Sequence, residues 1–226
     1  MIEIKGFLET SFVDWPGKIC SVLFLPYCNF RCPYCHNHPL VLYPEQYESI
    51  LFQDILSYLQ SFKGWIDGVC LTGGEPTLHG GLPSLIREIK RHGFLVKLDT
   101  NGSNPQMLEE MIEERTIDFI SMDVKAPLDP FNYRRSTGIL VNLDPILKSI
   151  EILKKGKVEY EFRMTVVPQL HKKEDIKTLG EQLKAGRRLV LKNFNPENPL
   201  DPSLKHTLPY DPKVLEEMER IVQEMT

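Results

Sequence analysis

The feature that most constrains the fold is a repeated alternation of short apolar runs with helical patterns. Strands separated by helices pair in parallel, because a parallel neighbour needs a crossover connection. Nearly continuous apolar strands also favour a sheet covered on both faces. The alternation therefore predicts an α/β fold with a parallel sheet, whose strands we expect at residues 19–25, 68–71, 94–98, 117–124, 160–167 and 188–194.

Six strand–helix units are too few for a complete eightfold barrel, so the sheet is either an open partial barrel or a doubly wound sheet. The chain has no internal repeat, low-complexity tract or linker-like stretch, and we expect a single domain over residues 1–226. In both architectures, ligands bind beyond the carboxyl ends of the strands. Polar or special residues follow the predicted strands at these ends, so we expect a site on one rim.

Four local signals predict where helices begin or end. Pro44 suits the first turn of a helix that continues through Leu59 on an apolar stripe. Asn104 and Asp144 each precede a proline and are expected to cap a helix. Gly156 is expected to end one.

The bulk properties favour an ordinary globular chain. It has 226 residues, 42% of them hydrophobic, and a net charge of -4. A slightly acidic chain does not attract phosphate backbones, so we expect no nucleic-acid partner. No apolar run approaches the roughly 20 residues that span a membrane, and the first residues do not resemble a signal peptide. We therefore expect a cytoplasmic protein.

Three of the five cysteines crowd into one short loop after the first predicted strand: Cys28, Cys32 and Cys35. Thiolates are soft ligands that suit zinc or iron–sulfur clusters. A structural zinc needs a fourth ligand, for which His36 or His38 is near in sequence. A disulfide with a free thiol, or accidental clustering, are further alternatives. Without a fourth ligand, three cysteines leave one iron of a cubane open to a substrate.

Cys20 and Cys70 lie inside predicted strands, and we expect them to be buried as small apolar residues. His171 has no partner evident from spacing, so we expect it at the surface or in a capping role.

The loop Cys28-Asn29-Phe30-Arg31-Cys32-Pro33-Tyr34-Cys35 matches the CxxxCxxC signature of the radical S-adenosylmethionine (SAM) superfamily. The segment 35–37, Cys-His-Asn, resembles the enzymes that activate glycyl-radical enzymes. The segment 14–17, Asp-Trp-Pro-Gly, resembles their DGPG segment, with tryptophan in place of glycine. Overall the chain is most similar to the short-form activases of anaerobic ribonucleoside-triphosphate reductases. This resemblance implies a partial (β/α)6 TIM-like barrel with parallel strands, one [4Fe-4S] cluster held by the three cysteines, and SAM.

Further segments resemble SAM-binding motifs of these enzymes. Residues 73–75, Gly-Gly-Glu, resemble the GGE motif that binds the SAM amino group, although alone they would read as a βα turn. Residues 99–102, Asp-Thr-Asn-Gly, resemble a segment beside SAM that helps to bind a monovalent cation. Read alone they are turn residues before a helix cap. The SAM contacts that the resemblance implies are Tyr34, His36, Gly73, Gly74, Glu75, Asp99, Thr100, Asp123, Val124, Lys125, Arg163 and Asn195.

Alternatives remain open for the charged members of this set. Residues 123–125, Asp-Val-Lys, resemble a DLK motif that contacts SAM, but could form an ordinary ion pair at a strand end. Arg163 could reach the SAM carboxylate, an acidic group of a partner, or a structural salt bridge. Pyruvate formate-lyase activating enzyme has a SAM-contacting histidine on its last strand, where this chain has Asn195. Asparagine can form hydrogen bonds but does not titrate like histidine.

The resemblance implies an enzyme that cleaves SAM reductively to a 5′-deoxyadenosyl radical. With this radical it would install a glycyl radical on anaerobic ribonucleoside-triphosphate reductase. Flavodoxin or ferredoxin is the implied electron donor. Two alternatives stay open: radical SAM chemistry on another target, either a different glycyl-radical enzyme or a small molecule, and a zinc-binding module without catalysis.

Overall fold

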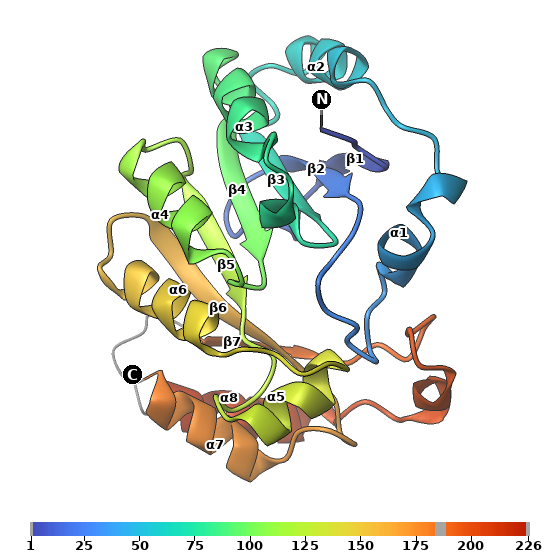
Figure 1. Ribbon diagram of the computed structural model, residues 1–226, viewed down its shortest axis with the longest axis vertical. Coiled ribbons are helices and arrows are strands. Elements are labelled where there is room, and N and C mark those ends of the chain that lie inside the picture. Colours follow the sequence, from blue (N-terminus) through green and yellow to red (C-terminus); the bar gives the residue numbers. More distant parts are fainter. Residues whose placement is uncertain (1, 184–188, 225–226) are drawn as a thin grey trace.

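The computed structural model describes residues 2–183 and 189–224, and its centre is a seven-stranded sheet (Figure 1). The strands follow one another in chain order across the sheet. All six predicted strands are present, although Arg188, the first residue of the last predicted run, lies outside the described residues. The strands are β1 (Gly6–Ser11), β2 (Cys20–Leu25), β3 (Gly68–Gly73), β4 (Leu95–Thr100), β5 (Phe119–Asp123), β6 (Glu159–Val166) and β7 (Leu189–Asn193).

Strand order decides between the two predicted architectures. A doubly wound sheet reverses its strand order at a switch point. Here β2 to β7 are parallel and stay in chain order, as in a barrel. The strand order gives β1 and β7 one neighbour each, so the barrel is open between them. The prediction of a partial TIM-like barrel is confirmed.

One strand was not predicted. β1 pairs antiparallel with β2, and Gly6 lies opposite Phe24. Most residues of β1 are at least partly exposed, because the strand forms an edge of the sheet. It therefore lacks the continuous apolar run that marks a central strand.

Helices connect the parallel strands and cover one face of the sheet (Figure 1). The predicted cap at Asn104 is confirmed, since its side chain accepts the Met107 N–H at 3.3 Å. Gly156, with φ +68°, follows the end of its helix as predicted. The helices are α1 (His38–Leu42), α2 (Phe52–Ser61), α3 (Leu82–Arg91), α4 (Pro105–Glu113), α5 (Pro130–Thr137), α6 (Asp144–Lys154), α7 (Lys173–Gln182) and α8 (Pro212–Gln223); the 3₁₀ helices are η1 (Pro44–Gln46), η2 (Pro76–Leu78) and η3 (Pro202–His206).

Two predicted helix starts are wrong. Pro44 begins only η1, and α2 starts at Phe52. The chain between them is held instead by the N-terminal segment: the Ile50 N–H donates to the Ile4 carbonyl at 2.8 Å, which replaces a bond within a helix. Asp144 is the first residue of α6 rather than its cap, and its N–H donates to the Asn142 side chain.

The two faces of the sheet differ in chemistry. On the outer face, alternate residues such as Leu23, Leu71 and Ile120 are fully buried under the helices. The inner face carries small and charged side chains instead, including the fully buried Lys97. Trp15 packs at the amino ends of the strands with the buried Cys20, Val22 and Cys70, as predicted for the two cysteines. The charged inner positions therefore line the interior of the half-barrel.

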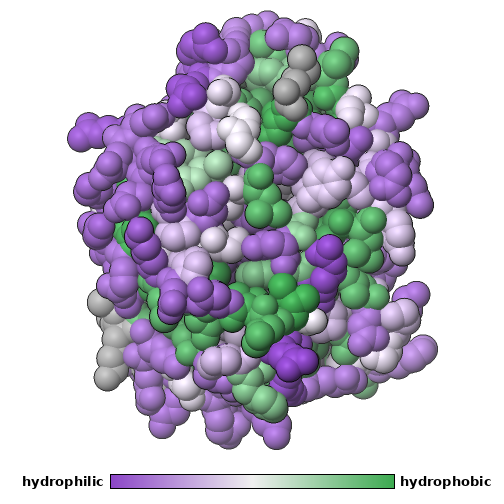
Figure 2. Space-filling model, viewed as in Figure 1, coloured by the Kyte–Doolittle hydropathy of each residue, from purple (hydrophilic) through white to green (hydrophobic). Residues whose placement is uncertain are grey.

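The surface visible in Figure 2 combines polar and apolar residues. Figure 2 shows hydrophilic residues along the margins of one face and apolar patches toward its middle and lower half. Within the described residues, no helix is both long enough and apolar enough to cross a membrane.

Candidate functional site

A cavity of about 760 Å³ opens at the carboxyl ends of the strands, where ligands bind in folds of this kind. Of the predicted site residues, fourteen line it: Cys28, Cys32, Tyr34, Cys35, His36, Gly73, Gly74, Glu75, Asp99, Thr100, Asp123, Lys125, Arg163 and Asn195. The fifteenth, Val124, is fully buried in the core and its side chain is not part of the lining. The lining also contains residues that were not among the predicted contacts: Val13, Phe30, Asn37, Val41, Thr72, Asn101, Thr165, Lys192 and Asn193.

The cysteine loop is folded tightly against α5. The Arg31 N–H donates to the Thr137 carbonyl at 2.8 Å, and its guanidinium donates to the carbonyls of Cys28 and Phe30 at 2.7 Å. The Cys28 thiol accepts the Phe30 N–H at 3.3 Å and faces the Asn101 amide at 3.9 Å. All three thiols are free, and donors of this kind to sulfur tune a bound iron–sulfur cluster.

The surroundings of these thiols favour their protonated form unless a metal is bound. Burial raises the pKa of Cys28 and of Cys32 to about 11, and it also raises the pKa of Cys35. The Lys125 ammonium counteracts this rise at all three thiols. Metal ligands must be deprotonated, so binding of iron here would release protons.

The two glycines after β3 allow a close approach of two loops. Gly73 has φ +112°, which side chains rarely permit. A Cβ on Gly74 would lie 1.8 Å from the carbonyl oxygen of Tyr27, and Tyr27 is the residue before Cys28. Tyr27 itself has φ +61°, and its carbonyl accepts the Glu75 N–H at 2.8 Å. The glycine turn therefore packs directly on the start of the cysteine loop.

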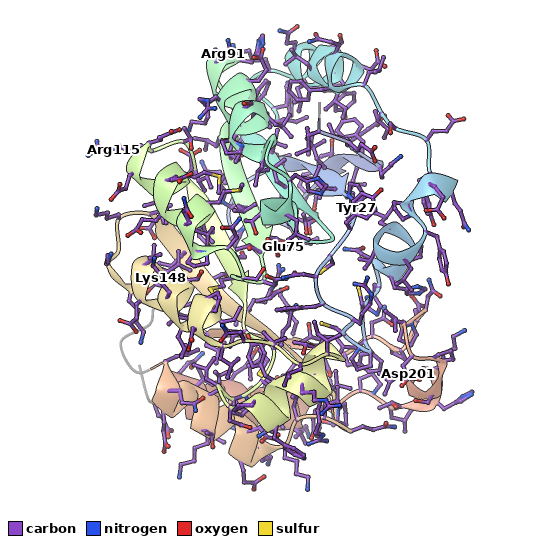
Figure 3. All side chains as sticks on the ribbon, in the orientation of Figure 1. Tyr27, Glu75, Arg91, Arg115, Lys148 and Asp201 are labelled. Carbon is purple, nitrogen blue, oxygen red and sulfur yellow. The ribbon has the colours of Figure 1, made fainter. Side chains whose placement is uncertain are left out.

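The buried Glu75 side chain connects the loop after β3 to the loop after β4 by hydrogen bonds. Its carboxylate accepts bonds from the Thr77 and Thr100 hydroxyls, at 2.6 and 2.7 Å, and from the Thr77 and Asn101 N–H groups, at 3.0 and 2.6 Å. Burial raises its pKa, and these hydrogen bonds act in the opposite direction. In Figure 3, Glu75 lies near the centre beside Tyr27, whereas Arg91 and Lys148 project from outer helices and Arg115 from the turn after α4.

A chain of ion pairs runs from the barrel interior to the rim. Lys97 contacts Asp99, Asp99 accepts from Arg163 at 3.1 Å, and Arg163 donates to Asp123 at 2.7 Å. Lys125 completes the chain on Asp123 at 2.9 Å. Burial would raise the pKa of Asp123, but Arg163 and Lys125 outweigh it and hold that pKa below its usual range. Lys97 was not predicted as part of the site, and the signal for it was a charged residue within an apolar run.

Two histidines, His171 and His36, make contacts that the sequence did not predict. His171 was expected at the surface or in a capping role. It is buried, and its ring accepts the Val167 N–H at 3.0 Å and lies 2.8 Å from the Ser136 hydroxyl. His36 Nε2 lies 2.8 Å from the Asn195 carbonyl, which joins the cysteine loop to the segment after β7. The Asn195 side chain accepts the Glu197 N–H at 2.9 Å within its own loop.

The thiol arrangement fits a cluster better than one metal ion. Within residues 2–183 and 189–224, no three His, Cys, Asp or Glu side chains converge as a site for a single ion. The zinc alternative requires such convergence around Cys28, Cys32, Cys35 and a histidine. A cubane spaces its thiolates more widely, because each binds a different iron. Three free thiols on one cavity wall, with no fourth, suit that group.

Comparison with known proteins agrees with this geometry. The model of the radical SAM superfamily matches residues 22–181, which include the cysteine loop and every rim segment up to β6. The chain belongs to the radical SAM superfamily. The family implies a [4Fe-4S] cluster and SAM, and the site described above contains residues that fit both.

Two relatives in sequence are similar over most of this radical SAM protein. A protein of Methanocaldococcus jannaschii, provisionally assigned as a glycyl-radical enzyme activating enzyme, is 33% identical over 89% of this chain and 84% of its own length. A pyruvate formate-lyase-activating enzyme of Clostridium pasteurianum is 30% identical over 81% of this chain and 77% of its own. With relatives of this kind, the radical SAM protein is an enzyme.

A solved structure supports the fold alone. SuiB of Streptococcus suis, bound to the precursor peptide SuiA, superposes with a TM-score of 0.66 at 16% identity. The match covers 88% of this chain and 43% of SuiB, so this chain corresponds to less than half of SuiB.

Proposed function

We propose that this radical SAM enzyme installs a glycyl radical on a partner protein, with anaerobic ribonucleoside-triphosphate reductase as the leading target. The observation that carries the proposal is the cysteine loop, whose three free thiols share one rim cavity with the Gly73–Gly74 turn and the Asp99 and Asp123 carboxylates. The similarity to activating enzymes over most of the chain supports this reaction class.

The cysteines would hold the [4Fe-4S] cluster, and the residues around it would orient SAM. When bound and reduced, this cluster would supply the electron for splitting SAM into methionine and a 5′-deoxyadenosyl radical. Tyr34 and His36 would flank the adenine, and the Gly73–Gly74 turn and Glu75 would receive the amino group. Lys125 and Arg163 offer positive charge to the SAM carboxylate. The electron would come from a flavodoxin or ferredoxin.

The partner's glycine must reach the cavity to lose a hydrogen atom from its α-carbon. The barrel is open between its two edges, and the cavity lining includes Val13, in the loop after β1, and Lys192, in β7. Reaction requires the glycine carbon about 3 to 3.5 Å from the radical. Hydrogen transfer yields 5′-deoxyadenosine and the glycyl radical.

The first experiment separates this enzyme from a zinc-binding module. Anaerobic reconstitution should give a brown protein with iron, sulfide and visible absorbance. On reduction with SAM, it should form methionine and 5′-deoxyadenosine. A colourless protein that retains only zinc would contradict the proposal.

The second experiment identifies the target. The reduced enzyme and SAM are incubated with anaerobic ribonucleotide reductase or with pyruvate formate-lyase, and electron paramagnetic resonance detects a glycyl radical. The similarity to the Clostridium enzyme favours pyruvate formate-lyase as the second candidate. Asn195, at the predicted position of a histidine of that activase type, favours the reductase. SAM cleavage without a radical on the reductase would refute the leading target.

A further inference from the structure

The carboxylate of Asp99 has no free oxygen for a metal ion. The segment 99–102 resembles the cation-binding segment of activating enzymes, and this resemblance implies a monovalent cation beside it. In the structure, Oδ1 of Asp99 contacts the Lys97 ammonium. Its Oδ2 accepts from Arg163 at 3.1 Å and lies 3.5 Å from the Thr72 hydroxyl. A cation at Asp99 would have to displace one of these donors.

Both oxygens of the neighbouring carboxylate, Asp123, also accept hydrogen bonds from protein donors. Asp123 Oδ1 accepts from Arg163 Nε at 2.7 Å, and Oδ2 accepts from Lys125 at 2.9 Å. The Asp99 side chain is 9% exposed and that of Asp123 26%, so water screens the pair only in part. All four oxygens of the two carboxylates therefore carry donors from the protein itself.

The chain of ion pairs also has no excess negative charge that a metal ion would neutralise. The hydrogen-bonded chain contains three cationic groups and two carboxylates. Glu161, which accepts from the Ser121 hydroxyl at 2.8 Å, adds one more carboxylate on the inner face of β6. Even with it, the carboxylates of this inner face do not outnumber the cationic groups. The further carboxylate at the cavity, Glu75, has both oxygens occupied by hydrogen bonds from Thr77, Thr100 and Asn101. Another cation would be repelled by Arg163 and Lys125 at close range.

Arginine has the shape that this position requires. Its guanidinium is planar, stays charged, and presents N–H groups in two directions, so one side chain can bridge two carboxylates. Arg163 uses Nε toward Asp123 and a terminal nitrogen toward Asp99. Lysine presents a single ammonium and cannot reproduce this fork.

We propose that the Arg163 guanidinium replaces the monovalent cation: it joins Asp99 to Asp123, so that the cavity binds SAM without Na⁺ or K⁺. Besides the charge that it offers to the SAM carboxylate, Arg163 then acts as a positioning residue that holds the two rim carboxylates in register. The inference rests on the proposed function only in taking SAM as the ligand.

The test measures the affinity of the reconstituted enzyme for SAM in salts of Na⁺, K⁺ or tetramethylammonium. Each salt is used at about 0.1 M, so that screening is equal. The wild-type dissociation constant should change less than about twofold among the salts. Arg163→Met frees two carboxylate oxygens, Asp99 Oδ2 and Asp123 Oδ1. Its affinity for SAM should therefore fall, and should recover about tenfold in Na⁺ or K⁺ relative to tetramethylammonium. Arg135→Met, an arginine outside the cavity lining, should behave as wild type.

A second readout does not depend on SAM. The thermal midpoint of the ligand-free holoprotein is compared in the same three salts. It should be independent of the cation in the wild type, and it should rise with Na⁺ or K⁺ only in Arg163→Met. If the enzyme failed to bind SAM while these midpoints behaved as expected, the proposed function would fail. The replacement of the cation by Arg163 between Asp99 and Asp123 would still stand.

A clear result would overturn the inference. If the wild type lost about tenfold or more of its SAM affinity when tetramethylammonium replaced Na⁺ and K⁺, a metal cation would be required. A wild-type midpoint that rose with Na⁺ or K⁺ would also contradict it. Both observations use the wild type, so they decide the question even if Arg163→Met does not fold.

Discussion

At the scale of single residues, the five cysteines divide into two kinds. Cys28, Cys32 and Cys35 line the cavity, whereas Cys20 and Cys70 are fully buried at the inner face of the strands. Burial raises the pKa of both kinds, so the difference in chemistry comes from position rather than from acidity. Access to the cavity is what qualifies the first three as ligands.

Replacement of one ligand should remove the cluster. Cys32→Ala should lower bound iron and sulfide by more than about tenfold, because a metal site depends on each ligand. Cys70→Ala is the matched control, since it removes a buried thiol that does not reach the cavity. Iron and sulfide assays after anaerobic reconstitution check the pair, and equal iron in both variants would contradict the assignment of ligands.

Lys97 should contribute to stability through its ion pair. Burial lowers its pKa, but Asp99 outweighs this effect and the pKa is raised, so the ammonium stays charged. Lys97→Met leaves the Asp99 carboxylate with Arg163 as its one cationic partner among the described residues, and should lower the free energy of unfolding by about 3 kcal/mol.

Denaturant unfolding of the Lys97→Met variant measures this loss. A second substitution, Asp99→Asn, removes the carboxylate that has lost its Lys97 partner and should restore part of the stability without restoring SAM affinity. A loss below about 1 kcal/mol for Lys97→Met would argue that the pair is nearly neutral in energy.

At the scale of elements, the turn after β3 and the end of β2 fit together only without a side chain on Gly74. Gly74→Ala would force the Tyr27 carbonyl to move, and with it the start of the cysteine loop. We expect cluster content to fall about tenfold even without SAM, as for a lost supporting contact. Gly80→Ala is the control, because nothing lies within 4 Å of its added carbon. Full cluster loading with weakened SAM binding would assign Gly74 to ligand contact alone.

His171 links α5 to the turn after β6 and makes stability depend on pH. Burial lowers its pKa from 6.5 to about 4. The unfolded chain binds a proton below pH 6.5 and the folded chain does not, so stability is full above pH 6.5 and falls as pH drops toward 4. Between pH 7 and 5, the free energy of unfolding should fall by about 2 kcal/mol from this group.

The comparison with His171→Gln isolates this term. The variant should lose less stability between the two pH values than the wild type, as measured by denaturant unfolding at each pH. Identical losses in both proteins would show that other groups cause the pH dependence.

At the scale of the whole molecule, much of the architecture follows from local patterns. The apolar runs identified β2 to β7, because central parallel strands are buried and nearly continuous. The edge strand β1 was missed because it is half-exposed. Pro44 misled the prediction of α2, because bonds to the N-terminal segment replace helical bonds there. The organisation as one domain over residues 1–226 stays a prediction.

The sequence by itself determined which residues could bind a cluster and which residues lie at the end of each strand. Ligand chemistry and the two-residue period of a strand are local properties. Only the tertiary structure decided which of these groups meet. Strands far apart in sequence bring Lys97, Asp99, Asp123 and Arg163 into one chain of ion pairs, and the same packing buries His171 and Val124. Charge pairing and burial depend on distances across the barrel, which no local pattern encodes.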